Sequence, residues 1–263
     1  MKSLTELPVV IFCGGEGTRL GEETQHQPKP LLNIGSEPIL LHIMRLYAAH
    51  GFRRFILCLG YKGNLIKEHF LDYDIRRRDI RLNLATGNKD FLSEGLTTDW
   101  DVIFAETGEK TQTGARLARV ARYVDTDHFL CTYGDGLANV DLVALAQFHL
   151  GHGSIGTLTG IETYSQFGLL RTDDTKVVGF EEKPRIPGLV NGGFFMFRRD
   201  FFDYVSDDAG CILEREPLEK LTRDGQLRVF RHSGFWQCMD TFKDYKLLNE
   251  MWAKSPAPWT VRD

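Results

Sequence analysis

The distribution of apolar and polar positions over the first 150 residues is typical of an α/β protein. Three short runs, Val9–Cys13, Phe55–Leu59 and Phe129–Tyr133, are apolar at nearly every position, and each is followed directly by a glycine. Strands that are buried on both faces of a parallel sheet have this character, and glycine marks where such strands end. The runs therefore predict three strands of one buried sheet.

Stretches between and after these runs carry apolar residues at the spacing of an amphipathic helix. The four groups are Ile39, Ile43, Leu46 and Tyr47; Leu65, Ile66, His69 and Phe70; Leu117, Val120, Ala121 and Val124; and Leu142, Leu145 and Phe148. Alternating strands and helices predict a doubly wound α/β fold, whose ligands bind beyond the carboxyl ends of the strands. Candidate chemistry is therefore expected directly after Cys13, Leu59 and Tyr133.

After residue 150 short strands predominate. The predicted strands are Ser154–Thr163, Gly168–Thr172, Val177–Phe180, Gly193–Phe197 and Leu227–Phe230, and the predicted helices are Glu214–Arg223 and Thr241–Ala253. This spacing indicates a mixed or antiparallel portion of the sheet. We expect residues 1–263 to form one domain with two halves, about 1–150 and about 151–263.

The segment Asp72–Asp101 has no clear helical period. It is either a small β insertion or a long loop. A long segment of this kind in a compact domain is usually functional or part of an oligomer contact, so we expect one of these roles.

Composition excludes several classes of protein. The chain has 263 residues and a formal net charge of −4, so no general basic field exists to bind nucleic acid or an anionic membrane. The N-terminus lacks the apolar core of a signal peptide, and no apolar run approaches the roughly 18 residues of a membrane span. A cytoplasmic protein is expected. The five cysteines contain no C-x-x-C pair, which favours reduced thiols over disulfides or a zinc site.

A glycine-rich segment, Gly14–Leu20, follows the first predicted strand. Its three glycines allow backbone N–H groups to point at an anion, and Arg19 adds a guanidinium group for phosphate oxygens. The segment matches neither a P-loop nor a dinucleotide fingerprint, and alone it could be an ordinary turn. Lys29, which stands between two prolines that restrict its backbone, favours a phosphate site.

A carboxylate follows the third predicted strand, where Asp135 stands between Gly134 and Gly136. Such a group suits Mg²⁺, which proteins hold by one or two carboxylates while substrate phosphates and waters complete the octahedron. An Asp-Gly turn is the alternative. Asp240 could supply the second carboxylate, or it could only be the N-cap of the last helix.

Several motifs occur together in one order along nearly the whole chain. They are G-G-x-G-T-R-L at Gly14–Leu20, P-K-P at Pro28–Pro30, G-D-G at Gly134–Gly136, E-K-P at Glu182–Pro184 and N-G-G at Asn191–Gly193. In this the chain resembles the sugar-1-phosphate nucleotidyltransferases, also called nucleotide-sugar pyrophosphorylases. The resemblance implies a Rossmann-like, doubly wound mixed sheet of the nucleotide-diphospho-sugar transferase type, with small β insertions.

Within this family the chain is most similar to the cytidylyltransferases that act on glucose 1-phosphate. The stretches that carry this likeness are Ile43–Tyr47, Gly60–Gly63, Thr113–Leu117, Thr132–Gly136 and Gly234–Thr241. The likeness implies CTP and glucose 1-phosphate as substrates, Mg²⁺ as cofactor, no nucleic-acid or membrane partner, and a homo-oligomer, namely a hexamer. Leu169–Arg171 departs from the family pattern near the expected sugar pocket. UTP, dTTP or another sugar 1-phosphate therefore stay open, as does a regulatory protein without catalysis.

The resemblance also implies a role for each motif residue. In the first half, the β and γ phosphates are bound by Gly14, Gly15, Gly17, Thr18 and Arg19, the α-phosphate by Lys29, the remaining nucleotide by Thr111, Arg116 and Gly134, and Mg²⁺ by Asp135 and Asp240. In the second half, Lys183 binds the sugar phosphate, and the sugar is lined by Gly168, Glu182 and Asn191. The catalytic set is Arg19, Lys29, Asp135 and Asp240.

Electrostatics explains these residue types. A sugar phosphate dianion that approaches an anionic α-phosphate is repelled by about 8 kcal/mol at about 4 Å and an effective dielectric near 20. Neutralising and aligning the two phosphates must therefore supply most of the catalysis. No general base is needed, because the nucleophile is already ionised.

Overall fold

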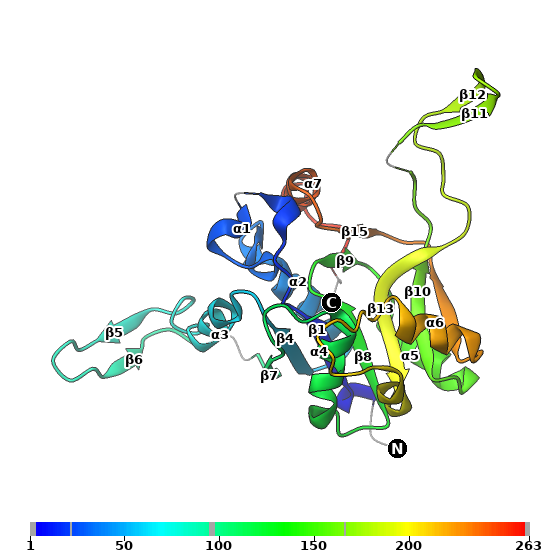
Figure 1. Cartoon of the computed structure of the whole chain (residues 1–263). Coiled ribbons are helices and arrows are strands. Elements are labelled where there is room, and N and C mark those ends of the chain that lie inside the picture. The colour runs from blue at the N-terminus through cyan, green and yellow to red at the C-terminus, as the bar shows by residue number, and fades with distance from the viewer. Residues whose placement is uncertain (1–3, 22, 95–97, 166, 261–263) are drawn as a thin grey trace.

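The computed structural model describes residues 4–21, 23–94, 98–165 and 167–260. Within these ranges, seven strands form a central mixed sheet in the order β14-β10-β13-β8-β1-β4-β7 (Figure 1). The strands are β1 (Pro8–Phe12), β4 (Arg54–Leu59), β7 (Asp101–Glu106), β8 (His128–Tyr133), β10 (Gly156–Ile161), β13 (Val190–Arg198) and β14 (Leu227–His232). β13 is antiparallel to both of its neighbours, and the other pairs are parallel.

Helices cover both faces of this sheet. One face packs α2 (Ile39–Ala49), α3 (Gly63–Leu71), α5 (Leu142–His152) and α7 (Phe242–Ala253), and the other packs α4 (Thr113–Val120), α6 (Glu216–Arg223) and the 3₁₀ helix η5 (Arg199–Tyr204). Side chains alternate along β1, so that Val9 and Ile11 join the first core while Val10 and Phe12 join the second. This double burial is why the strand is apolar at every position, and it confirms the doubly wound fold class.

Short elements surround the main sheet. The hairpins and pairs are β2 (Asn33–Ile34) with β3 (Glu37–Pro38), β5 (Ile80–Leu82) with β6 (Lys89–Phe91), β9 (Gly136–Ala138) with β15 (Trp236–Cys238), and β11 (Leu169–Asp173) with β12 (Lys176–Glu181). The remaining helices are α1 (Glu23–His26) and the 3₁₀ turns η1 (Leu4–Glu6), η2 (Thr18–Leu20), η3 (Lys29–Leu31) and η4 (Ala121–Tyr123).

Two of these hairpins extend away from the body as arms (Figure 1). The first arm, β5–β6, lies within the segment Asp72–Asp101, so the alternative of a β insertion is confirmed. Residues 95–97 of that segment lie outside the described residues. The second arm, β11–β12, carries exposed apolar side chains at Leu169, Leu170, Val177, Val178 and Phe180.

The strands and helices expected from the sequence are present, with shifts of a few residues at their ends. The edge strand β7 was not predicted. Its first half faces solvent more than the central strands do, so its apolar run is shorter and weaker.

Two expectations from composition also have outcomes. All five cysteines are free thiols, and Cys13, Cys58 and Cys131 are buried in the sheet. Among the described residues, no helix has the length and apolar character needed to cross a membrane.

Candidate active site

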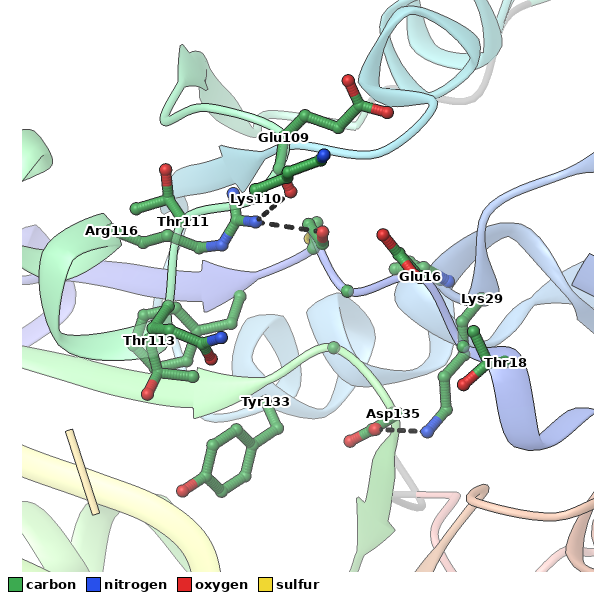
Figure 2. A pocket seen from close by; sticks show the side chains of 18 residues that line it. Glu16, Thr18, Lys29, Glu109, Lys110, Thr111, Thr113, Arg116, Tyr133 and Asp135 are labelled. Carbon is green, nitrogen blue, oxygen red and sulfur yellow. Dashed lines mark hydrogen bonds and ion pairs between the residues drawn. The ribbon is translucent and has the colours of Figure 1, made fainter. Parts of the chain in front are cut away.

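A cavity of about 500 Å³ opens at the carboxyl end of the sheet (Figure 2). Its walls come from the glycine-rich segment after β1, the loop of residues 109–113 after β7, and residues 133–135 at the end of β8. Lys29 and Arg116 complete the lining. The cavity lies where the topology of a doubly wound sheet places ligands.

The glycine-rich segment is held in place by Arg116. The guanidinium donates to the carbonyl oxygens of Gly14 at 3.0 Å and Leu59 at 2.9 Å, and to the hydroxyl of Thr107 at 2.7 Å. A fourth bond, of 3.2 Å, reaches the carbonyl oxygen of Glu109. Burial lowers the pKa of Arg116. One buried cation thus connects the ends of β1, β4 and β7 beneath the cavity.

The predicted phosphate-binding glycines take the conformations that this segment needs. Gly17 has φ 64°, a left-handed backbone that glycine adopts without strain. The Thr24 hydroxyl of α1 donates to the Gly17 carbonyl oxygen at 3.2 Å. Gly14, Gly15, Gly17 and Thr18 all line the cavity.

Lys29 joins the two predicted metal ligands. Its Nζ lies 2.6 Å from Asp135 Oδ2 and 2.8 Å from Asp240 Oδ1 (Figure 2 shows the bond to Asp135). The lysine side chain is only 12% exposed, so these ion pairs are shielded from solvent. Burial alone would lower the pKa of Lys29, but the two carboxylates outweigh burial and raise it. The Lys29 side chain therefore keeps its positive charge and is held between the two carboxylates.

Asp240 reaches Asp135 through the small sheet β9–β15, in which Cys238 pairs with Gly136. The Met239 N–H also donates to the Asp135 carbonyl oxygen at 2.9 Å. Burial would raise the pKa of Asp240, but Lys29, followed by Arg19, lowers it overall. Two residues 105 positions apart in the sequence thus share one ammonium group.

The alternative that Asp240 is the N-cap of the last helix is wrong. Thr241 caps α7, and its hydroxyl accepts from the Asp244 N–H at 3.2 Å. The Asp244 carboxylate in turn accepts from the Thr241 N–H at 2.8 Å, which completes a capping box. Asp240 is therefore free to serve the site.

Arg19 lies near Asp240 and is not among the residues that line the cavity. Its Nη1 is 3.9 Å from Asp240 Oδ2, and its side chain is 75% exposed. An exposed guanidinium of this kind is available to phosphate oxygens that enter the cavity. Thr111 lines the opposite wall, is buried, and accepts from Arg119 Nη1 at 2.9 Å.

The predicted sugar residues divide into two groups. Asn191 lies beside the cavity, since its Nδ2 donates to the hydroxyl of the lining residue Tyr133 at 3.3 Å. Gly168, Glu182 and Lys183 belong instead to the arm β11–β12, and Lys183 Nζ lies 4.0 Å from its neighbour Glu182 Oε1. Among the described interactions, none joins these three residues to the cavity. The structure thus brings Asn191, but not the arm residues, to the site.

Reasoning from the sequence missed other residues of the cavity wall. Glu109, Lys110 and Gln112 line it, as does Tyr133. The first three lie in the loop that follows the unpredicted strand β7, and of that loop the family resemblance had pointed only to Thr111. Glu214, which bonds Tyr133, carries no motif at all.

The donor set fits a divalent cation. Asp135 and Asp240 direct oxygens at a common point, and the Lys29 ammonium now binds there. Among the described residues, no three His, Cys, Asp or Glu side chains gather as a metal-binding group. The protein would therefore supply two hard oxygen ligands, and substrate phosphates and waters would complete an octahedron.

Comparisons with known proteins identify the family of this chain. The sequence profile of the nucleotidyl transferase family matches residues 8–252. The chain therefore belongs to the nucleotidyl transferase family, and it is an enzyme of that class.

Individual proteins are similar to the chain over nearly its whole length. The chain is 44% identical over 255 residues to the probable glucose-1-phosphate cytidylyltransferase of Bacillus subtilis, covering 97% of this chain and all of that protein. It is also 44% identical to the glucose-1-phosphate cytidylyltransferase of Salmonella typhi, covering 96% and 98% of the two chains.

Solved structures support the fold. The crystal structure of HddC from Yersinia pseudotuberculosis aligns with a TM-score of 0.66 at 24% identity, covering 94% of this chain and 99% of that one. A putative glucose-1-phosphate thymidylyltransferase from Bacillus anthracis aligns with the same TM-score at 16% identity, covering 93% and 94%. Both share the mixed sheet of the nucleotide-diphospho-sugar transferases.

Proposed function

We propose that this protein transfers the cytidylyl group of CTP to α-D-glucose 1-phosphate, giving CDP-glucose and pyrophosphate. The observation that carries the proposal is the convergence of Lys29, Asp135 and Asp240 beside the glycine-rich segment. The similarity to two glucose-1-phosphate cytidylyltransferases over nearly the whole chain supports the choice of substrates.

The reaction forms one bond and breaks one bond at the α-phosphorus of CTP. A phosphate oxygen of glucose 1-phosphate attacks the α-phosphorus of CTP, and the bond from that phosphorus to the bridging oxygen of pyrophosphate breaks. The amides of Gly14, Gly15 and Gly17, with Arg19, bind the β and γ phosphates and so neutralise the leaving group. Lys29 meets the α-phosphate, where negative charge gathers as the nucleophile approaches.

We propose Mg²⁺ as the cofactor, held by Asp135 and Asp240. When bound, the ion neutralises the triphosphate and aligns the attacking oxygen with the phosphorus. Asp135 and Asp240 would hold the ion through the carboxylate oxygens that now accept from Lys29, and the Lys29 ammonium would remain beside them as a second positive charge for the phosphates.

Thr111, Arg116 and Gly134 are proposed nucleotide residues. Thr111 lines the wall opposite the carboxylates, and Gly134 lines the floor. The nitrogens of Arg116 already donate to protein acceptors, so we propose that this residue acts by fixing the segment that contacts phosphate.

Gly168, Glu182, Lys183 and Asn191 are proposed sugar residues. Lys183 would have to come to a substrate phosphate from the arm β11–β12. Lys183→Ala should raise the KM for glucose 1-phosphate more than the KM for CTP. Equal effects on both KM values would show that this lysine does not bind the sugar phosphate specifically.

We also propose a homo-oligomer, and a hexamer by family resemblance. Several large apolar side chains are exposed on each of the two arms, and this supports association, because apolar side chains gathered on a surface often mark an interface. Light scattering coupled to gel filtration tests this, and a monomer at micromolar concentration would contradict it.

The decisive experiment is a matrix of CTP, UTP, dTTP, ATP and GTP against several sugar 1-phosphates, with pyrophosphate release as the readout. CTP with glucose 1-phosphate should give the highest kcat/KM. Turnover of UTP or dTTP more than tenfold faster than CTP would overturn the base assignment. A clear preference for another sugar 1-phosphate would overturn only the sugar.

A further inference from the structure

The hydroxyl of Tyr133 connects the cavity wall with two side chains from distant parts of the sequence. Tyr133 Oη donates to Glu214 Oε1 and accepts from Asn191 Nδ2, which lies at 3.3 Å. Burial, followed by the Glu214 charge, raises the pKa of Tyr133, so the phenol keeps its proton. A phenol has one proton, and a carboxylate has none to give. Glu214 therefore makes Tyr133 an acceptor toward Asn191.

The direction of this bond fixes the amide of Asn191. Its Oδ1 accepts from the Gly193 N–H at 2.9 Å, while its Nδ2 donates to Tyr133. If the amide were turned over, its NH₂ group would face the Gly193 N–H, which is also a donor. Its oxygen would then face the lone pairs of the Tyr133 hydroxyl, which are also acceptors. The amide therefore has a single orientation, with one N–H and one lone pair left for a ligand.

Glu214 is itself held by a second residue of the cavity wall, Thr113. Its Oε2 accepts from Thr113 Oγ1 at 2.8 Å, and that oxygen accepts from the Leu213 N–H at 3.0 Å. Thr113 is the first residue of α4 and lines the cavity, as Tyr133 does (Figure 2). Both oxygens of Glu214 are thus committed, and the carboxylate has a fixed position although it lies in an exposed loop before α6.

We propose that Glu214 is a positioning residue for sugar specificity. Acting through Tyr133, it presents the free N–H of Asn191 to a hydroxyl group of the sugar 1-phosphate. The inference rests on the proposed function, in which Asn191 contacts the sugar. A site built to bond one hydroxyl discriminates against the analogue that lacks it, because its own polar group is then left without a partner.

The test compares glucose 1-phosphate with its monodeoxy analogues in the wild type and in variants. The measured quantity is the ratio of kcat/KM for glucose 1-phosphate to kcat/KM for each analogue. Glu214→Met removes the acceptor, so the phenol proton can turn to the Asn191 oxygen and release the amide. We expect the ratio for at least one analogue to fall about threefold to tenfold, the usual effect of one neutral hydrogen bond.

Two further variants separate positioning from a general structural effect. In Glu214→Gln the side-chain oxygen can still accept from Tyr133, so discrimination should stay within about twofold of the wild type. Tyr133→Phe should lose as much discrimination as Glu214→Met, and the double variant should lose no more, because both act on one chain of bonds.

Glu216→Met is the matched control, since Glu216 is an exposed acid in the first turn of α6 and close in sequence. It should leave the ratio unchanged. Unchanged discrimination in Glu214→Met would overturn the inference, as would an equal loss in Glu216→Met. If the wild type prefers another sugar 1-phosphate, the proposed function fails, and the same ratios measured with that sugar's deoxy analogues decide the role of Glu214.

Discussion

The ammonium group of Lys29 lies 2.6 Å from the carboxylate of Asp135, across 106 positions of sequence. The same ammonium bonds Asp240, so one lysine neutralises both carboxylates of the site. Two carboxylates that face each other without a cation repel each other. The Lys29 ammonium offsets this repulsion and occupies the point between them where a metal would compete with it.

A first prediction concerns metal binding without nucleotide. Lys29→Met should bind Mn²⁺ about tenfold more tightly than the wild type, because the metal no longer competes with an ammonium for both carboxylates. Electron paramagnetic resonance of free Mn²⁺ measures this directly. Lys243→Met, at an exposed lysine of α7, is the control and should match the wild type. Equal or weaker Mn²⁺ binding in Lys29→Met would refute the competition.

A second prediction separates two neighbouring acids. Asp240→Asn and Asp135→Asn should lose most activity while circular dichroism stays native, because each removes a metal ligand with little change in volume. Asp244→Ala should keep its kcat and lose about 1 kcal/mol of unfolding free energy, since it breaks the capping box of α7. Full activity of the wild type in excess EDTA would contradict the role of the metal.

A third prediction concerns the guanidinium under the glycine-rich segment. Arg116→Lys keeps the charge but cannot reach four acceptors at once. We expect a loss on the order of 2 kcal/mol in urea unfolding and a raised KM for CTP. Arg122→Lys is the control, because in the described part of the chain its guanidinium lies over the ring of its neighbour, Tyr123. A native KM together with lost stability would limit Arg116 to a purely structural role.

A fourth prediction concerns acid stability. His149 is buried, and its Nε2 lies 3.1 Å from His128 Nδ1. Its Nδ1 lies 2.8 Å from Thr157 Oγ1, which also contacts His152 Nε2 at 2.7 Å. Burial, with the nearby His128, His152 and Arg198, lowers the pKa of His149 to about 3.

The sign follows from linkage. An unfolded histidine has a pKa of about 6.5, so between about pH 6.5 and 3 the unfolded state binds more protons than the folded state. His149 therefore favours unfolding increasingly as pH falls through this window, by up to about 1.4 kcal/mol per pH unit.

Besides the histidines, the charged groups around this cluster are Asp127, Arg198, Asp200 and Arg228. His149→Gln should flatten the pH dependence of urea unfolding below pH 6.5, whereas His26→Gln, on α1, should leave it unchanged. An unaltered slope in His149→Gln would show that this histidine does not carry the acid sensitivity.

Much of the fold could be predicted because its strands are buried on two faces. Apolar runs such as Val9–Cys13, when followed by glycine and a helical pattern, are interpreted as strands of a buried sheet. The sequence did not predict β7, because this strand lies at the edge of the sheet. Asp101 and Val102 are not fully buried there, and buried and exposed positions do not alternate along the strand.

The candidate site could be predicted only as far as motifs are local. The glycines of Gly14–Leu20, Arg19 and Lys29 are close together in sequence. Asp135 could be located because it directly follows a predicted strand. The family resemblance implied that Asp135 and Asp240 act together, but the small sheet β9–β15 that brings them together was not predicted from the sequence. Glu214 lies in a loop, and its role comes from a contact with Tyr133 over 81 positions, which no periodicity encodes.

The fit between Gly14 and Arg116 constrains how this sequence can change. A methyl group on Gly14 would lie 2.2 Å from Arg116 Nη1, and one on Gly60 would lie 2.6 Å from the same atom. Neither glycine can gain a side chain while Arg116 keeps this position, and a smaller residue at 116 would take away one of the donors to the carbonyl oxygens of Gly14 and Leu59. A substitution at any one of these three positions therefore disturbs the packing of the other two.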